Sequence, residues 1–466
     1  MIFGSDSKKK SIPEETLLKS LASLKNLNHL DLSFLCLTFD QTDFLKNLMK
    51  TIRKAPKISN LSLLFADYDR LSSSHYNLFL STLLKLNHLR TLKFIFWDSK
   101  DLLNTDIKTF ISLLPRFSLL TKIDLSFGTS GQRLVQGCTL VNLFKAFQRM
   151  KNLVEFGFNM QGCDLVFEDS DEYLLQSLNC LAGSSIKRLN LGLFKNFSNG
   201  NLRELSEGLK ELTLLKSLCL FICQGCPLTD GYIAEFGSVL ACFTSLTSLR
   251  LSLPSGLTNK NIVETIASAL RSLQNLVYLQ FDFRFDNETE DQQFQALFST
   301  FKSFKSLKYL DINIRYQKKI TDTSLEVLGE SLKDLNILKS FQLELSYVPL
   351  ITNKGVEAIC SGIQKSLSHL FLLGLKFDYN GNVNEKVLHK IGKTLQSLFF
   401  LYSVGLGFGT CLNVVDFKDF FNQLREMKNI QEIRVSLADS EVNRKALECF
   451  HNVDNGFVIF FKKNRN

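Results

Sequence analysis

Two cysteines three residues apart are the residues whose spacing most directly suggests chemistry. Cys223-Gln-Gly-Cys226 is a C-x-x-C pair, and Cys219 lies just before it. Such a pair can hold zinc or exchange a disulfide, but a structural zinc ion takes four ligands. No second cysteine pair or histidine pair follows at a suitable spacing, and the six histidines are scattered along the sequence. We therefore expect no metal site, no cofactor and no redox activity.

Sequence signatures of common enzyme classes are also missing. The sequence contains neither a phosphate-binding P-loop nor the G-x-S-x-G motif of hydrolases. Gly405, Gly407 and Gly409 form a G-x-G-x-G, but this motif falls within a predicted strand, whereas a dinucleotide site requires it after one. Glycines within a strand let another backbone approach closely. The sequence predicts a protein that is not an enzyme and takes no small-molecule substrate.

The chain is organised by a repeat of the form L-x-x-L-x-L-x-L, which starts most clearly at Leu246 and Leu307. Neighbouring copies lie 29 to 33 residues apart. A period in this range is typical of a solenoid, which grows by adding units rather than by enlarging one core. The fourteen copies start at Leu27, Ile58, Leu89, Leu120, Leu153, Ile186, Leu215, Leu246, Leu276, Leu307, Leu338, Leu370, Leu401 and Ile430.

Each copy predicts one strand followed by one helix. Alternation of apolar and polar residues predicts the strand, and apolar residues at i, i+3, i+4 and i+7 predict the helix. Four units open the helix with an apolar residue, Thr and then Asp or Asn, where Thr or the next residue caps the helix. These turns begin at Leu228, Leu257, Ile320 and Ile351. We expect parallel strands joined by right-handed crossovers.

This pattern resembles the leucine-rich repeats of the ribonuclease-inhibitor-like class over nearly the whole chain. The resemblance implies an α/β horseshoe of about 14 units of ~31 residues, with strands on the concave face and helices on the convex face. The family often has Asn or Cys after the strand, where the side chain satisfies backbone groups in the turn. Cys223 fills that place in one repeat, and most other repeats have an apolar or mixed residue there.

Side chains between the later apolar positions of each strand are expected to face the concave side. Leu64, Ile95 and Trp97 put an apolar cluster there, and Trp97 is the only tryptophan. Exposed apolar and aromatic groups mark interfaces, unless a loop covers them or Trp97 turns into the core. A mixed-charge zone further along either binds a charged partner or pairs internally. The other candidate contact residues are Phe194, Phe221, Arg250, Asp282, Arg284, Asp311, Arg315 and Glu344.

No linker or low-complexity segment interrupts the repeats, so we expect a single domain over residues 11–461. Within it, residues 11–26 form an N-terminal capping helix, 27–440 the repeats and 441–461 a C-terminal cap. The apolar run at 456–461 is a candidate fifteenth strand. Residues 1–10 and 462–466 are expected to be basic tails, the first of them disordered.

Charge and hydropathy narrow the range of partners. The net charge is +9, but the two tails carry much of it and no basic stripe runs along the repeats, so we expect no nucleic-acid partner. No apolar run of 18 residues and no signal-peptide core occurs, so we expect no membrane insertion. Eleven cysteines without framework spacing indicate an intracellular protein, cytoplasmic or in a cytoskeletal or organelle-associated assembly.

The function predicted from these features is a protein–protein interaction scaffold, one subunit of a larger assembly. Two alternatives stay open. One branch of the resembled class activates small GTPases with a loop arginine, and Arg70 and Arg133 are the candidates on strand-to-helix loops of early repeats. The other is a ubiquitin-ligase substrate receptor, although the sequence has no recognisable F-box.

Overall fold

The computed structural model divides the chain into two compact units, Met1–Cys223 and Gln224–Asn466. The expected single domain over residues 11–461 remains a prediction. The structure describes residues 2–3, 14–24, 26–35, 42–55, 57–66, 73–97, 104–128, 133–161, 163–166, 173–194, 196–223, 226, 228–253, 262–283, 289–409, 420, 423–424, 427, 429–437 and 458–463.

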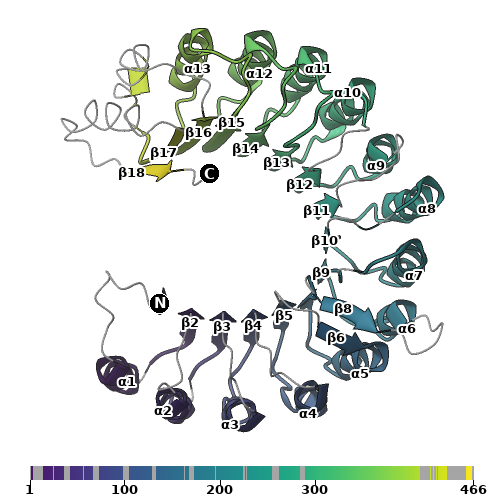
Figure 1. The fold of residues 1–466 in the computed structure, drawn as a ribbon, viewed down its shortest axis with the longest axis vertical. Helices are drawn as coiled ribbons and strands as arrows, with labels where there is room; N and C mark the ends of the chain where they lie inside the picture. Colours follow the sequence, from purple (N-terminus) through teal and green to yellow (C-terminus); the bar gives the residue numbers. More distant parts are fainter. Residues whose placement is uncertain are drawn as a thin grey trace. The chain divides into compact units, whose positions relative to one another are not determined.

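The N-terminal unit is a parallel sheet whose strand order follows the chain, with helices on one of its faces (Figure 1). Its strands are β1 Ile2–Phe3, β2 His29–Leu35, β3 Asn60–Ala66, β4 Thr91–Trp97, β5 Lys122–Gly128, β7 Glu155–Asn159, β9 Arg188–Gly192 and β10 Ser217–Phe221. Its helices are α1 Glu14–Ser23, α2 Thr42–Arg53, α3 Ser73–Leu83, α4 Asn104–Leu113, η2 Leu114–Arg116, α5 Gly137–Gln148, α6 Tyr173–Asn179 and α7 Asn199–Lys210. A separate two-stranded parallel sheet joins β6 Arg133–Gln136 to β8 Cys163–Val166.

The C-terminal unit repeats the same strand–helix order (Figure 1). Its strands are β11 Ser248–Leu253, β12 Tyr278–Phe283, β13 Tyr309–Asn313, β14 Ser340–Glu344, β15 Leu372–Lys376, β16 Ser403–Gly409, β17 Glu432–Leu437 and β18 Val458–Lys463. Its helices are α8 Asp230–Ala241, α9 Ile262–Leu270, α10 Asp291–Thr300, η3 Phe301–Ser303, α11 Asp322–Leu332, α12 Asn353–Ser366 and α13 Lys386–Gln396.

The predicted repeat solenoid is confirmed, because a strand begins two residues after each of the fourteen sequence positions. The run proposed as a fifteenth strand contains the start of β18, which pairs in parallel with β17. Helix α1 lies within the expected capping segment, and β1, which the sequence did not predict, pairs with β2. The helix expected around 441–450 lies outside the described residues.

Strand burial alternates where the strands are fully extended. In β13, Leu310 and Ile312 are buried, while Tyr309 and Asp311 point away from the helical layer. Stacked phenylalanines fill the space between strands and helices, as in the Phe79–Phe94 pair of the N-terminal unit, with ring centroids 4.3 Å apart. The many phenylalanines of this sequence are therefore largely core residues, since aromatic pairs bury large areas in such offset stacks.

Threonine and aspartate at the predicted helix starts have two different roles. Thr321 caps α11 by accepting a hydrogen bond from the Thr323 backbone N–H at 3.3 Å. Asp322, the next residue, reaches the following repeat, where its carboxylate accepts bonds from the Thr352 N–H at 2.8 Å and the Gly355 N–H at 3.0 Å. The turn motif therefore caps its own helix and fixes the neighbouring repeat.

Side chains after the strands also bond between repeats, as the resembled family implies. The Cys223 thiol donates to the Leu193 carbonyl at 3.0 Å. The Gln317 and Asn380 side-chain amides donate to the carbonyls of Phe283 and Leu345, each at 2.8 Å. The sequence indicated this role for Cys223 alone, because Gln317 and Asn380 follow their strands at a longer spacing.

Three tyrosines at one repeat position share a left-handed backbone conformation. Tyr316, Tyr347 and Tyr379 have φ of 66°, 60° and 61°. Such values are uncommon outside glycine because Cβ approaches backbone oxygen. Their rings stack with centroid separations of 4.6 and 4.4 Å, and the Tyr316 N–H donates to the Ser346 carbonyl at 3.1 Å. Stacking and repeat-to-repeat hydrogen bonds together hold this turn.

Candidate functional site

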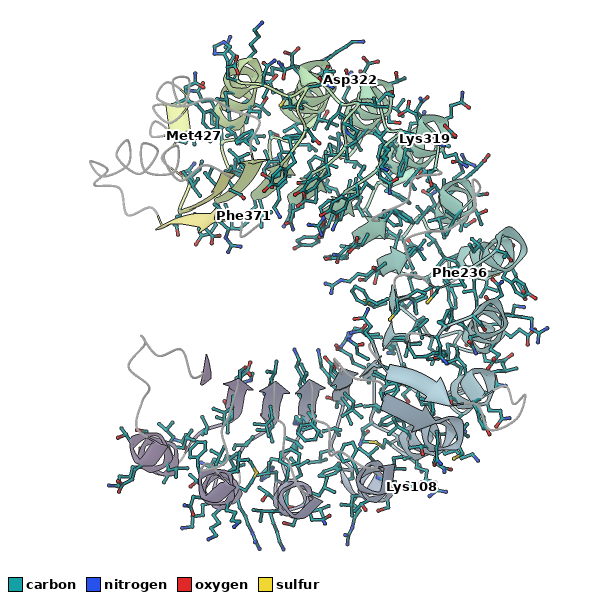
Figure 2. All side chains as sticks on the ribbon, viewed as in Figure 1. Lys108, Phe236, Lys319, Asp322, Phe371 and Met427 are labelled. Atoms are coloured by element: carbon teal, nitrogen blue, oxygen red, sulfur yellow. The ribbon has the colours of Figure 1, made fainter. Side chains whose placement is uncertain are left out.

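The open face of the C-terminal unit carries aromatic side chains where its strands begin. Tyr278 and Tyr309 are the first residues of β12 and β13, and their outward position follows from strand alternation. Three further residues immediately precede the repeat motif, on the loops that lead into β14, β15 and β16: Ile337, His369 and Phe400. Figure 2 shows Asp322 at the helical layer of this unit and Phe371 on its strand layer.

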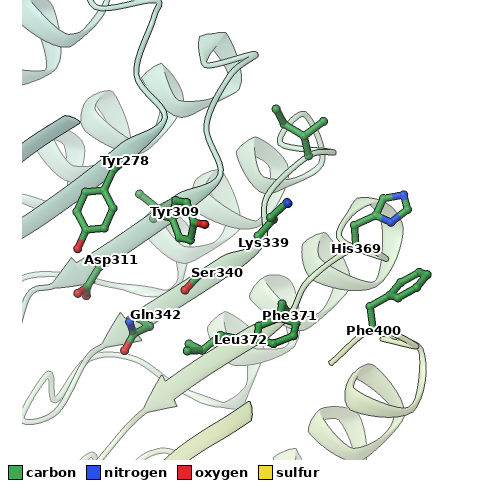
Figure 3. A pocket seen from close by; sticks show the side chains of 12 residues that line it. Tyr278, Tyr309, Asp311, Lys339, Ser340, Gln342, His369, Phe371, Leu372 and Phe400 are labelled. Carbon is green, nitrogen blue, oxygen red and sulfur yellow. The ribbon is translucent and has the colours of Figure 1, made fainter. Parts of the chain in front are cut away.

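These residues line a groove of about 820 Å³, called the aromatic groove below (Figure 3). Its exposed apolar members include Phe400 at 60% exposed, Phe371 at 50%, Tyr309 at 41% and Ile337 at 39%. Large apolar side chains with such exposure are characteristic of interfaces. The full lining is Tyr278, Tyr309, Leu310, Asp311, Ile337, Lys339, Ser340, Gln342, His369, Phe371, Leu372 and Phe400.

Pairwise stacking orders the rings of the aromatic groove and its border. The Tyr278 and Tyr309 rings stack with centroids 6.0 Å apart. Phe371 stacks on Tyr402 at 4.8 Å, with planes 6° apart. His369 stacks on Phe400 at 5.5 Å. Rings held in this way lose little conformational entropy when a partner covers them, which favours them as binding anchors.

Asp311 is the carboxylate in the groove lining, and its environment is unfavourable for a charge. Burial raises the pKa of Asp311 to about 6, and the nearby Asp282 carboxylate adds to the increase. Within the part of the chain that the structure describes, the Asp311 carboxylate makes no hydrogen bond or ion pair. The groove thus contains a half-buried carboxylate that lacks a direct partner.

Two strands beyond Gln342, the neighbour of Asp311, the strand face has no covering side chain in the described part of the chain. Its row continues through Gln342 in β14 to Gly374 in β15 and Gly405 in β16. A Cβ added at Gly405 would have the Gly374 Cα as its nearest neighbour, at 3.8 Å, so no side chain of the described residues covers this position, whereas the Gln342 side chain lies over Gly374. This part of the surface lets another backbone approach the sheet closely.

The structure locates most of the predicted charged residues on this unit. Arg250 is exposed, with its guanidinium carbon 4.6 Å from the centre of the Tyr278 ring. Asp282 is buried at 7% exposed, and Arg315 is half-buried beside Tyr316. Glu344 forms a cross-strand ion pair with Lys376 at 3.1 Å. Arg284 lies outside the described residues.

The predicted apolar residues of the N-terminal unit are only partly assembled. Leu64 and Ile95 are register partners on β3 and β4, and both are half-buried. Trp97 ends β4, but its side chain lies outside the described part of the structure. Phe221 is half-buried at the end of β10.

The predicted outward position of Phe194 is wrong. Its side chain is fully buried and packs against Phe197, with ring centroids 5.5 Å apart. Strand β9 ends at Gly192, so the period-two alternation no longer applies two residues later and the chain turns toward the core. Phe194 is consequently a core residue and contributes no accessible surface.

The cysteine pair lies after β10, and the candidate arginines lie earlier in the chain. Cys226 is buried and Cys223 is half-buried, and the described residues include no group of three or more His, Cys, Asp or Glu that could hold a metal ion. Arg70 lies outside the described residues. Arg133 was expected on a loop, but its backbone begins β6, and its side chain is not among those described.

The aromatic groove itself was missed because part of its lining lies outside the strands, although Tyr278 and Tyr309 follow the strand alternation. Several lining residues lie just before the repeat motif, where other units have polar or aliphatic residues. Recurrent apolar residues at that single position could have revealed it: Leu119, Leu214, Ile337 and Phe400.

Comparisons with known proteins agree with the fold. No protein-family model and no curated protein matches the chain. Among solved structures, the chain is similar to Rad7 in the structure of the Rad7 and Elc1 complex in yeast, with 18% sequence identity and a TM-score of 0.53. The match covers 96% of this chain and 92% of that chain. At this identity the similarity shows the fold alone.

A membrane-spanning helix needs about 20 consecutive, mostly apolar residues, and this requirement can be applied to the helices in the described part of the chain. None of these helices is both long and apolar enough to cross a bilayer.

Proposed function

We propose that this chain is a non-catalytic scaffold that binds a protein partner on the strand-bearing face of its repeats, as a subunit of a larger assembly. The aromatic groove carries this proposal. Four of its lining residues, Tyr309, Ile337, Phe371 and Phe400, each have more than a third of their surface exposed to water. Exposed aromatic clusters of this kind are favoured as interaction sites, because covering them removes apolar surface from water.

The structural neighbour supports this choice of function. Rad7 was solved together with Elc1, so a chain of similar fold takes part in a protein complex. The interrepeat bonds of Cys223 and Asn380 support placing these repeats in the ribonuclease-inhibitor-like class. Repeat proteins of this type usually bind large partners on their strand faces. The cysteine content favours an intracellular assembly.

Affinity purification with cross-linking, from cells that express the protein, tests this proposal. Full-length wild type is compared with Phe371→Ala and Phe400→Ala. We expect a defined set of partners with wild type that is reduced about tenfold in each variant, since buried aromatic anchors dominate interfaces. The melting temperature of each variant should stay close to that of wild type, because both side chains are exposed.

Leu214→Ala is the matched control. Leu214 is 53% exposed and occupies the repeat position of Phe400, but it lies in the N-terminal unit. Its replacement should leave the recovered partners unchanged. Recovery of the same proteins at the same levels with all four baits would exclude the aromatic groove as the contact surface.

A further inference from the structure

We propose that the aromatic groove receives a peptide segment of the partner that carries a lysine or arginine beside an apolar residue, with the cation bound by Asp311. This inference rests on the proposed scaffold function and specifies the chemistry of the partner. The apolar residue of the peptide contacts Phe371 and Phe400, and the cation reaches the carboxylate between the strands.

The apolar part of the peptide is indicated by the lining of the groove. Phe371 and Phe400 are half or more exposed, and each is held by a stacked neighbour, Tyr402 and His369 respectively. Tyr309 extends this surface toward Asp311 (Figure 3). An aliphatic or aromatic peptide side chain would bury these rings without reorganising them.

The basic residue of the peptide is indicated by the charged groups that surround Asp311. Two basic residues act on it electrostatically, Lys376 and Arg250. Lys376 is already paired with Glu344 at 3.1 Å, and Arg250 lies over the Tyr278 ring at 4.6 Å. Among the described residues, Asp311 therefore has negative neighbours but no ion-pair partner of its own.

Covering the groove would make the charged Asp311 carboxylate still less favourable unless the partner supplies an opposite charge. A peptide that offered only apolar groups would remove the remaining water from Asp311 and leave an unpaired buried carboxylate, which is costly. A lysine or arginine supplies both the opposite charge and the hydrogen-bond donors. Lys339 also lines the groove, but its side chain is exposed and can turn toward water when a peptide cation arrives.

The glycine pair explains how a peptide main chain can reach the carboxylate. Gly374 and Gly405 are register partners in the same row as Asp311 and Gln342. Among the described residues no side chain lies within 4 Å of a Cβ built at Gly405, so a peptide backbone can lie near the sheet there. The Gln342 side chain lies over Gly374, so a basic peptide side chain reaches Asp311 by passing the Gln342 amide.

Selection from a displayed library of random short peptides tests the inference. The full-length wild-type chain is the immobilised target. Enriched peptides are synthesised together with neutral analogues, in which norleucine replaces lysine and citrulline replaces arginine. Calorimetry then measures the affinity of both forms for wild type, Asp311→Asn and Phe371→Ala.

The expected result is a set of peptides with lysine or arginine next to an apolar residue. Neutralising that residue should weaken binding to wild type about tenfold or more, since hydrogen bonds to charged groups are the strong ones. Asp311→Asn should cause a similar loss for the charged peptide and little further loss for its neutral analogue. Asp124→Asn, at the same repeat position in the N-terminal unit, is the matched control and should change neither affinity.

Other outcomes separate this inference from the scaffold proposal. Enriched peptides that lack a basic residue but still require Phe371 would overturn the cation assignment and leave the scaffold function standing. Self-association of wild type that Phe371→Ala abolishes would instead identify a second copy of the chain as the occupant. Failure to enrich any peptide also overturns the inference, and the cross-linking comparison then decides the scaffold proposal independently.

Discussion

The same repeat position carries ion pairs in the N-terminal unit and aromatic rings in the C-terminal unit. The position is the first residue of each strand. In β5, β7 and β9 it holds Lys122, Glu155 and Arg188, whose charges join across the strands. In β12 and β13 it holds Tyr278 and Tyr309, which stack and remain partly open to water.

A second position, two residues further along the strand, shows a similar contrast. Burial raises the pKa of Asp124, but the Lys93 and Lys122 ammonium groups oppose this effect. Lys93 is its direct register partner, and Gly157 on the other side leaves room for its carboxylate. Asp311 has Gln280 and Gln342 as register partners instead.

This difference indicates how one framework yields two kinds of surface. The buried positions repeat almost unchanged because every unit must fill the same space between strand and helix. The outward positions are free of that constraint. In the N-terminal unit Lys122, Glu155 and Arg188 pair with one another, whereas the aromatic groove combines exposed rings with a carboxylate that has no hydrogen bond or ion pair within the described residues. The second surface therefore has more to gain from a partner.

The largest effect is expected from core truncations, which should be alike in the two units. Leu310→Ala and Ile123→Ala remove buried residues at the same repeat position. Each should destabilise its unit by about 2–5 kcal/mol through lost burial and a cavity. Chemical denaturation followed by hydrogen exchange would measure this loss locally. A much smaller loss for one of the pair would break the assumption of a common framework.

Asp311→Asn should stabilise the C-terminal unit at pH 7. The pKa of this carboxyl is about 6 in the folded chain and 3.8 in the unfolded one. The folded state therefore holds its proton more tightly, and stability falls as the pH rises from about 4 through 6. Removing the charge should recover up to about 3 kcal/mol above pH 7, while binding of the charged peptide weakens about tenfold or more.

Denaturation of wild type and Asp311→Asn across this pH window checks the prediction. The charged groups that act on Asp311 are Asp282, Glu344, Lys376 and Arg250. Titration of these groups contributes to both proteins, so the difference between wild type and Asp311→Asn isolates the contribution of Asp311. The variant should lose the pH dependence between about 4 and 6 that wild type shows. Asp124→Asn is expected to stabilise less, because the Lys93 and Lys122 ammonium groups oppose the effect of burial on the pKa of that carboxyl. Equal gains in stability from Asp311→Asn and Asp124→Asn would show that the two carboxylates do not differ in the way proposed for the two units.

The sequence predicted the solenoid because its buried positions recur at a fixed period. It predicted the surface less well, and two residues show why. Phe194 was placed outward by a period-two rule that applies only while the backbone remains extended, and β9 ends before it. Phe400 was missed because it lies on a loop, where neither strand nor helix periodicity acts. The pKa of Asp311 depends on charged side chains from four other strands, and a local sequence pattern cannot predict such contacts.

Trp97→Ala compares the binding site suggested by the sequence with the one found in the structure. If Trp97 is an anchor, its removal should weaken partner binding by more than about 1 kcal/mol and leave the melting temperature nearly unchanged. The same measurements on Phe371→Ala provide the reference. A large drop in melting temperature for Trp97→Ala alone would instead identify the tryptophan as a core residue and leave the groove as the remaining candidate surface.

The smallest effect is expected from Glu155→Gln, which tests whether the N-terminal ion pairs satisfy that surface. Burial by itself would raise the pKa of Glu155, but hydrogen bonds from Lys122 and Arg188 outweigh it and lower the pKa below its usual value of 4.5. The resulting stability is present above pH 4.5 and is lost as the pH falls through the folded pKa. Because these side chains are partly exposed, the substitution should cost only about 0.5–1 kcal/mol, and less in high salt. Thermal denaturation at low and high ionic strength measures this cost. An unchanged stability at low salt would mean that the pairs contribute nothing, and the N-terminal surface would then be as available to a partner as the aromatic groove.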